Sequence, residues 1–289
     1  MSRIFILLIF LVLCSCSNEK HIKDTFFLMN TVIEVDLEGI SESKWEKIKR
    51  DFTKNTDKFD WHKKGGKSAE WDSLSIIARN FEKLTQGCFN TRIRPLVKLW
   101  TQAREKNDLP SKDAIRLALS NHDEEDFGGI AKGYLTDKLY FDIIKAGVKK
   151  GYINSGGHIR VIGNQKPGIE GWEIGIRHPD RKDEIFENIK ISSNQAIATS
   201  GDYERFFMFN GKRYCHILDP KTGYPPVHSV RSVTVVAEDL TTADALATGL
   251  FVAGLEGAKD WFYNLPMKLD VYWIYEKEGK LKSEHWSRN

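Results

Sequence analysis

TSGDYERFFMFNGKRYCHILDPKTG, residues Thr199–Gly223, is the stretch from which the fold is most readily deduced. Asn210-Gly211 is the dipeptide most typical of a two-residue hairpin turn, and it lies between the short apolar strand predicted at 206–209 and the partner strand predicted at 213–218. A small polar turn precedes this predicted hairpin, and Asp219–Gly223 forms a second tight turn after it. The sequence therefore predicts Ser, Asp, Thr and His side chains, with free backbone N–H groups, at one rim. A hairpin with well-formed turns and no site would show the same pattern.

A second informative segment is DFGGIAKGYLTD, residues 126–137. Gly128-Gly129 opens a predicted helix that continues to Ile144. A glycine turn at a helix N-terminus presents unpaired N–H groups to an anion, and Lys132 adds a positive charge. A Walker loop is excluded, because the GxxxxGK spacing and a following Ser or Thr are absent. Glycines that only start a helix beside a solvated lysine would explain the segment equally well.

Two further motifs carry chemistry. NSGG, residues 154–157, is a glycine turn between two predicted strands, where backbone N–H groups either form an anion nest or mark a bulge. ADALAT places Asp244 and Thr248 four residues apart, on one face of the predicted helix 241–254. Carboxylate and hydroxyl oxygens suit Mg²⁺. The alternative is a threonine cap, with Asp244 favoured in the first turn by the helix dipole.

In this order, DFGGIAKGYLTD, NSGG, SGDYERFF with HILDPKTG, and ADALAT resemble the motifs of the ApbE family, the FAD:protein FMN transferases. The resemblance runs from about residue 26 to about residue 254. It implies a compact α+β core with the flavin in a cleft. Interspersed helices and hairpin-paired strands independently favour a mixed α+β fold over a doubly wound parallel sheet.

The resemblance also implies an activity, the Mg²⁺-dependent transfer of FMN from FAD to a Thr or Ser hydroxyl with release of AMP. His216 is the candidate for the hydroxyl proton, since its ordinary pKa suits neutral pH, and Asp202 is the competing base. The implied metal ligands are Asp244, Thr248 and the backbone carbonyl of Gly129. The implied FAD contacts are Met29, Trp61, Asn90, Thr91, Asp126, Lys132, Ser200, Gly201 and Ile217. For Trp61, anchoring a helix end is as good an interpretation as stacking on the flavin.

Three positions depart from the family pattern: Asn30 replaces the usual Gly, Asn90 replaces the commoner Asp, and His158 stands where Asp is frequent. No role is assigned to His158. Asn30 keeps open a Mg²⁺-dependent FAD pyrophosphatase, in which water replaces the acceptor hydroxyl. A third alternative, from another class, is a non-catalytic FAD-binding lipoprotein. An intact Asp244 and Thr248 pair favours an enzyme, because a store of FAD needs no metal at the diphosphate.

The N-terminus predicts a lipoprotein export signal. Arg3 precedes an apolar run, residues 4–13, that is too short to span a bilayer as a mature helix. Leu13-Cys14-Ser15-Cys16 then resembles a bacterial lipoprotein box, with Cys16 as the lipidated residue. An ordinary cleaved signal with two incidental cysteines is the alternative.

These observations divide the chain into a signal peptide at 1–15, a tether at 16–25 and a transferase domain at 26–289. Lipidation would tether the domain to a bacterial membrane, on the exported, periplasmic or extracytoplasmic side. Acceptors implied by the resemblance are exported flavoproteins, such as FMN-binding subunits of sodium-pumping NADH:quinone reductase or Rnf-type complexes.

Composition adds two limits. The chain has 43 basic and 40 acidic residues, and removing 1–15 takes away only Arg3, which leaves 42 against 40. This near-balance argues against a nucleic-acid-binding surface. An oxidising compartment would permit a disulfide between Cys88 and Cys215, but a buried free thiol is favoured at Cys215.

The remaining secondary structure is predicted from the sequence pattern. The predicted elements are a strand at 26–37, helices at 41–59, 71–84, 111–119, 128–144 and 241–254, strands or β-structure around 152–162, 172–176, 185–197, 231–237 and 270–275, and a solvated C-terminal end.

Overall fold

The computed structural model describes residues 20–58 and 69–288, so Cys16 and Trp61 lie outside the described residues. The helices are α1 (Glu42–Lys58), α2 (Ala69–Leu84), α3 (Arg94–Lys106), α4 (Lys112–Ser120), α5 (Ala131–Lys145) and α6 (Leu240–Phe262). The strands are β1 (Lys20–Leu28), β2 (Thr31–Ile40), β3 (Lys150–Ser155), β4 (His158–Ile162), β5 (Trp172–Arg177), β6 (Ile185–Ile191), β7 (Ala196–Gly201), β8 (Phe206–Phe209), β9 (Lys212–Cys215), β10 (Val230–Ala237), β11 (Leu269–Lys277) and β12 (Lys280–Arg288).

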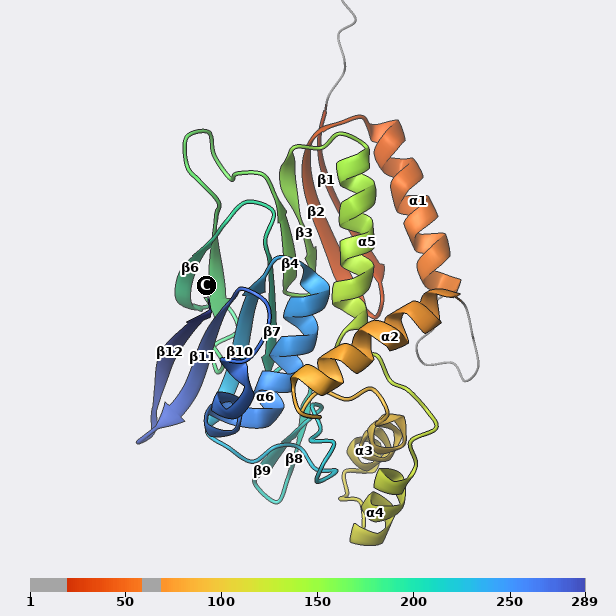
Figure 1. Ribbon diagram of the computed structural model, residues 1–289, viewed down its shortest axis with the longest axis vertical. Coiled ribbons are helices and arrows are strands. Elements are labelled where there is room, and N and C mark those ends of the chain that lie inside the picture. Colours follow the sequence, from red (N-terminus) through yellow and green to blue (C-terminus); the bar gives the residue numbers. More distant parts are fainter. Residues whose placement is uncertain (1–19, 59–68, 289) are drawn as a thin grey trace, which may run out of the picture.

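One large antiparallel sheet organises the molecule, with strand order β1-β2-β3-β4-β7-β10-β11-β12 (Figure 1). Strands β5 and β6 form a separate pair, as do β8 and β9. Helices α1, α5 and α6 cover one face of the large sheet, and α6 packs on β7 and β10 at its centre. The β5–β6 pair covers the other face. The predicted mixed α+β fold is confirmed, since every strand pair in the described residues is antiparallel.

The central strand β10 is buried on both faces, and this accounts for its many apolar residues. Val233 and Val235 point into the core under the helices, whereas Val236 belongs to the second core under β5 and β6. A strand buried on both faces needs apolar residues at successive positions, as Val235-Val236-Ala237 at its end supply.

Helices α5 and α6 cross in close contact. A Cβ atom at Gly133 of α5 would lie 2.3 Å from the carbonyl oxygen of Leu240, which no side chain could accommodate. The glycine therefore sets how near the segment 126–137 lies to the start of α6. This approach fixes one side of the site described below.

A third apolar cluster joins α3 and α4 to the chain beyond β9, through Leu96, Trp100, Ile115 and Leu218. The indole N–H of Trp100 donates to the carbonyl oxygen of Gly223 at 2.8 Å. The predicted turn that ends at Gly223 is thus held against α3. Figure 1 shows α3, α4 and the β8–β9 hairpin at the end of the long axis opposite to the start of β1.

The N-terminal prediction of one strand at 26–37 is wrong, because β1 and β2 form a hairpin there. Met29 and Asn30 make the turn, each with a φ of 56°, and asparagine tolerates this left-handed conformation better than most residues. β1 begins at Lys20, so residues 20–25 belong to the sheet instead of the predicted tether. Ile22 and Phe26 explain the difference, since both pack against the core.

Three other boundaries differ from the predictions. The C-terminal end, predicted as solvated, forms the edge strand β12, whose Trp286 is buried. β9 ends at Cys215, so His216 lies just beyond the strand. α6 runs on past Gly254, where a φ of 65° marks a kink. The other predicted helices agree with the structure to within a few residues.

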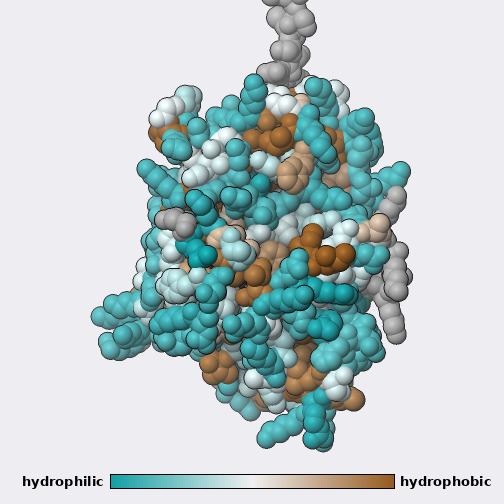
Figure 2. All heavy atoms as spheres, in the orientation of Figure 1, coloured by the Kyte–Doolittle hydropathy of each residue, from teal (hydrophilic) through white to brown (hydrophobic). Residues whose placement is uncertain are grey.

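Figure 2 shows hydrophilic side chains over most of one face of the molecule, with separate hydrophobic patches. Among the helices that the structure describes, none is long and apolar enough to cross a lipid bilayer. Cys88 and Cys215 are buried free thiols, which confirms the prediction for Cys215. Burial raises the pKa of the Cys215 thiol to about 11, so it is a poor nucleophile.

Candidate active site

A cleft of about 410 Å³ lies where α3, the start of α5, the first turns of α6, β7 and the β8–β9 hairpin meet. Its lining combines polar side chains, among them Lys132, Asp244 and Thr248, with aromatic and aliphatic ones, among them Phe89, Val97 and Phe207. Ten of the predicted site residues line this cleft: Asn90, Asp126, Gly129, Lys132, Ser200, Gly201, His216, Ile217, Asp244 and Thr248.

The start of α6 is fixed by two carboxylates. Asp239 caps its own helix by accepting from the backbone N–H of Thr242 at 2.7 Å. Asp137 of α5 reaches across and accepts from the backbone N–H groups of Leu240 and Thr241, at 3.0 and 2.8 Å. The predicted threonine cap is therefore replaced by aspartates. Because both helices are tied at this point, the side chains one turn further along α6 have defined positions.

Asp244 is the most constrained of these side chains. It is 2% exposed, and its two oxygens accept from Nε2 of His158 at 3.2 Å and from the backbone N–H of Gly133 at 3.0 Å. Burial acts to raise the pKa of Asp244, but the Lys132 charge and these hydrogen bonds outweigh it and lower the pKa to about 2. The carboxylate is consequently an anion throughout the physiological range.

Thr248 lies one turn beyond Asp244, beside Gly129 and Ser200. A Cβ atom at Gly129 would be 3.0 Å from the Thr248 hydroxyl oxygen, and Ser200 Oγ is 3.5 Å from that same oxygen. Carboxylate, hydroxyl and backbone carbonyl oxygens are the donors that a hard cation takes. The described residues contain no cluster of three or more His, Cys, Asp and Glu side chains, so such a cation would need carbonyl, hydroxyl or substrate oxygens as further ligands. Mg²⁺ binds in this manner, and the donor set fits it.

The predicted anion nest at NSGG is not formed. The N–H of Gly156 donates to the carbonyl of Val32, and the N–H of Gly157 donates to the Asn154 side chain, at 3.0 and 2.8 Å. The turn contributes its shape instead, since a Cβ atom at Gly156, with a φ of 61°, would lie 2.1 Å from the hydroxyl of Thr31. The turn between β3 and β4 therefore lies in close contact with Thr31 at the start of β2, and both line the cleft.

His216 lies across the cleft, just after β9. Its Nδ1 atom is 3.2 Å from the carbonyl oxygen of Arg205, and its backbone N–H donates to that carbonyl at 2.9 Å. A carbonyl only accepts, so Nδ1 carries the proton and Nε2 keeps its lone pair. The residue is accessible from the open cleft, yet removal from bulk water and the charges of Lys132 and Arg205 lower its pKa to about 4. His216 is thus neutral at neutral pH.

The model of the ApbE family matches residues 53–273 of this sequence. The chain belongs to the ApbE family. The curated FAD:protein FMN transferase of Haemophilus influenzae is 34% identical over 218 residues, which cover 66% of this chain and 62% of that protein. The chain therefore matches less than two thirds of that relative's length.

Solved structures agree on the fold. The crystal structure of the ApbE protein of Thermotoga maritima is 30% identical, covers 91% of this chain and 96% of its own, and superposes with a TM-score of 0.75. The flavin transferase ApbE of Vibrio cholerae has a TM-score of 0.77 at 24% identity, over 92% of this chain and 97% of its own. The second likeness supports the ApbE fold alone.

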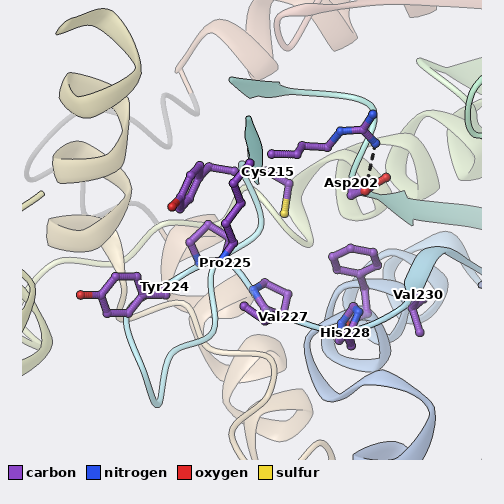
Figure 3. A pocket seen from close by; sticks show the side chains of 12 residues that line it. Asp202, Cys215, Tyr224, Pro225, Val227, His228 and Val230 are labelled. Atoms are coloured by element: carbon purple, nitrogen blue, oxygen red, sulfur yellow. Dashed lines mark hydrogen bonds and ion pairs between the residues drawn. The ribbon is translucent and has the colours of Figure 1, made fainter. Parts of the chain in front are cut away.

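Not every residue predicted from the ApbE resemblance lies in the cleft. Asp202 is held by Arg213 and Arg231 and lines a neighbouring cavity (Figure 3). Met29 lies in the β1–β2 turn, and Thr91 is buried behind the cleft, where its carbonyl accepts from the N–H of Asp126. Asn90 lines the cleft, but its amide is bonded to Glu82 and Arg92.

His158 is the residue of the ApbE site that sequence reasoning left without a role. It is buried against Asp244, and burial followed by the Lys132 charge lowers its pKa. Because ionised Asp244 can only accept, Nε2 of His158 donates, and its buried Nδ1 has no hydrogen-bond partner among the described residues. Its position directly after the Gly-Gly turn, at the start of β4, was an indication in the sequence that His158 lies near the site. Its contact with Asp244, however, joins segments far apart in the sequence and could not be predicted from local pattern.

Proposed function

We propose that this chain transfers FMN from FAD to a Thr or Ser hydroxyl of an exported or membrane flavoprotein and releases AMP. The observation that carries the proposal is the convergence of an oxygen-ligand pair that includes an ionised carboxylate, a lysine and a neutral histidine in one cleft. Such an array suits phosphoryl transfer, in which positioning and charge neutralisation supply most of the catalysis. Membership of the ApbE family and the names of its curated relatives point to the same reaction.

In the proposed step the acceptor oxygen forms a bond to the FMN-side phosphorus of the FAD diphosphate. The bond from that phosphorus to the bridging oxygen breaks, and AMP leaves with the electron pair. Lys132, at the start of α5, would neutralise part of the diphosphate charge. A Mg²⁺ ion held by Asp244, Thr248 and the Gly129 carbonyl would supply the remaining neutralisation.

His216 would accept the hydroxyl proton at Nε2, the nitrogen that its bond to Arg205 leaves unprotonated. In the free protein the lowered pKa makes it a weak base. Lys132 is one cause of that low pKa, so a bound diphosphate, which offsets the Lys132 charge, would raise it toward neutrality. The base would thereby gain strength when FAD is in place.

Lipid anchorage at Cys16 forms part of the proposal. An anchor there would join the fold at Lys20, where β1 begins, and the β8–β9 hairpin and α3 lie at the opposite end of the molecule (Figure 1). This arrangement supports a cleft end directed away from the membrane, toward exported domains of acceptors. FMN-binding subunits of sodium-pumping NADH:quinone reductase or Rnf-type complexes are the acceptors we propose.

The deciding experiment is the intact mass of a purified FMN-binding acceptor domain after incubation with residues 17–289, FAD and Mg²⁺. A gain equal to FMN less water, absent with Asp244→Ala, would establish the transferase. Free AMP and FMN without a mass gain would establish the FAD pyrophosphatase instead. FAD bound but unchanged would leave a flavin-binding protein.

A further inference from the structure

The hairpin that precedes His216 is attached to the molecule in two different ways. On its cleft side, Phe207 and Tyr214 pack on Trp100 of α3, with Tyr214 stacked at a ring distance of 5.7 Å. On its other side lies a cavity of about 240 Å³, bounded by β9 and by residues 224–230 (Figure 3). Trp100 therefore packs the hairpin on one side, and Cys215 at the end of β9 reaches the main core, whereas the cavity leaves part of the other side unfilled.

Asp202 bridges the gap on the cavity side. One of its oxygens accepts from Arg213 of β9 at 3.0 Å, and both accept from Nε of Arg231 in β10 at 3.1 Å. In Figure 3 the dashed line at Asp202 marks the ion pair with Arg213. Arg231 is only 13% exposed and is held in turn by Asp180, at 2.7 Å. The carboxylate thus ties the hairpin to the central sheet.

The same carboxylate is linked to His216 through a short loop and one backbone carbonyl. The loop from Asp202 to Arg205 leads into β8, and the Arg205 carbonyl accepts both the backbone N–H and Nδ1–H of His216. The backbone N–H of Asp202 also donates to the Arg231 carbonyl at 3.1 Å. Asp202 consequently fixes both the loop that orients the imidazole and the strand that ends beside it.

We propose that Asp202 is a positioning residue, which clamps Arg213 to Arg231 and so holds the His216 imidazole in the tautomer and place needed for transfer. The inference rests on the proposed function for its kinetic consequence. Small displacements of a reacting group cost up to about a hundredfold in rate. We therefore expect loss of the clamp to lower kcat by about tenfold to a hundredfold, with little change in KM for FAD.

The test compares Asp202→Asn and Arg213→Gln with Asp180→Asn, which removes another partner of Arg231 but does not touch the hairpin. Transfer kinetics give kcat and KM, FAD binding is measured by fluorescence quenching, and ¹⁵N NMR of the imidazole reports the His216 tautomer. Thermal unfolding shows that each variant is folded. A further variant, Asp202→Glu, retains the negative charge and should have a kcat between those of Asp202→Asn and the wild type.

We expect Asp202→Asn and Arg213→Gln to lose kcat and the Nδ1–H signature of His216. A double variant that combines these two substitutions should be no worse than either alone, and Asp180→Asn should resemble the wild type. The proposal is overturned if the imidazole spectrum is unchanged in both clamp variants, or if Asp180→Asn is equally impaired. Because the NMR readout needs no acceptor, it tests the clamp even if the wild type proves to be a hydrolase.

Discussion

The helical wall of the cleft, built by α5 and α6, is buried and tied by carboxylates to backbone N–H groups, whereas the hairpin wall is held by one aromatic stack and one ion-pair clamp. Asp244 on the helical wall is 2% exposed, while Phe206 and Met208 on the hairpin are 39% and 49% exposed. Elements with few buried contacts open at low free energy. Substitutions in the helical wall should therefore change stability and ion binding, and those in the hairpin should change kinetics first.

The largest effect on stability is expected from Asp137→Ala, which removes the carboxylate that joins α5 to the start of α6. The substitution deletes its hydrogen bonds to Leu240 and Thr241 and leaves buried Arg160 without its carboxylate, 3.6 Å away. Breaking one side of a buried pair costs about 3–5 kcal/mol. Urea unfolding measures the loss, with Asp142→Ala, an exposed residue of the same helix, as the control. Equal, small losses in both variants would show that the helical wall is not held at this point.

The next largest effect concerns transfer and ion binding in the same wall. Asp244→Ala should lower transfer by about 10²–10³-fold, the usual loss when one group that stabilises transition-state charge is removed. It also leaves Nε2–H of His158 and the backbone N–H of Gly133 without their acceptor, and the lowered pKa shows that folding stabilises this carboxylate, so the free energy of unfolding should fall as well. Kinetics, Mg²⁺ titration by calorimetry and urea unfolding check the three parts. Retained Mg²⁺ affinity in the variant would place the ion elsewhere.

The sequence predicts the elements of both walls. The helical wall could be predicted because its signals are local: Asp244 and Thr248 share one face of α6 through helical spacing, and Gly129 lies just before the start of α5. The hairpin was equally clear, since Asn210-Gly211 specifies its turn. The β1–β2 turn was missed because Met29-Asn30 lacks the glycine that usually marks a left-handed turn.

Long-range partners could not be predicted from local pattern. Asp202 suggested a base, but its environment is set by Arg231, 29 residues later, through the pairing of β7 with β10. His158 meets Asp244 only because β4 lies beside β7 under α6. β12 was missed because an edge strand with one solvated face carries many charges, and Trp286 alone indicates its buried side.

A pH experiment sharpens the comparison on the hairpin wall. His216 has a pKa of about 4 in the folded protein against 6.5 for the free side chain, so the unfolded chain takes up the proton first as pH falls. Its contribution to stability is complete above pH 6.5 and is lost as pH falls toward 4. As pH falls from 6.5 toward 4, the wild type should therefore lose unfolding free energy relative to the His216→Gln variant, which has no group titrating at this position. A difference that is constant with pH would mean that His216 titrates normally.

The smallest effects come from a pair of glycines, one at the cleft and one on the distal part of α6. A Cβ atom at Gly129 would lie 3.0 Å from Thr248 Oγ1 and 3.3 Å from the ring of Phe89, so Gly129→Ala should displace Thr248 and cost about 1–3 kcal/mol through overpacking. At Gly257, whose nearest neighbour would be the Ala253 side chain at 3.8 Å, alanine should stabilise the helix by about 0.5–1 kcal/mol. Urea unfolding and Mg²⁺ titration of both variants measure the contrast. If Gly129→Ala lowers Mg²⁺ affinity while Gly257→Ala leaves it unchanged, the close approach of Gly129 to Thr248 is required for the ion site; if both bind Mg²⁺ as the wild type does, that approach serves packing alone.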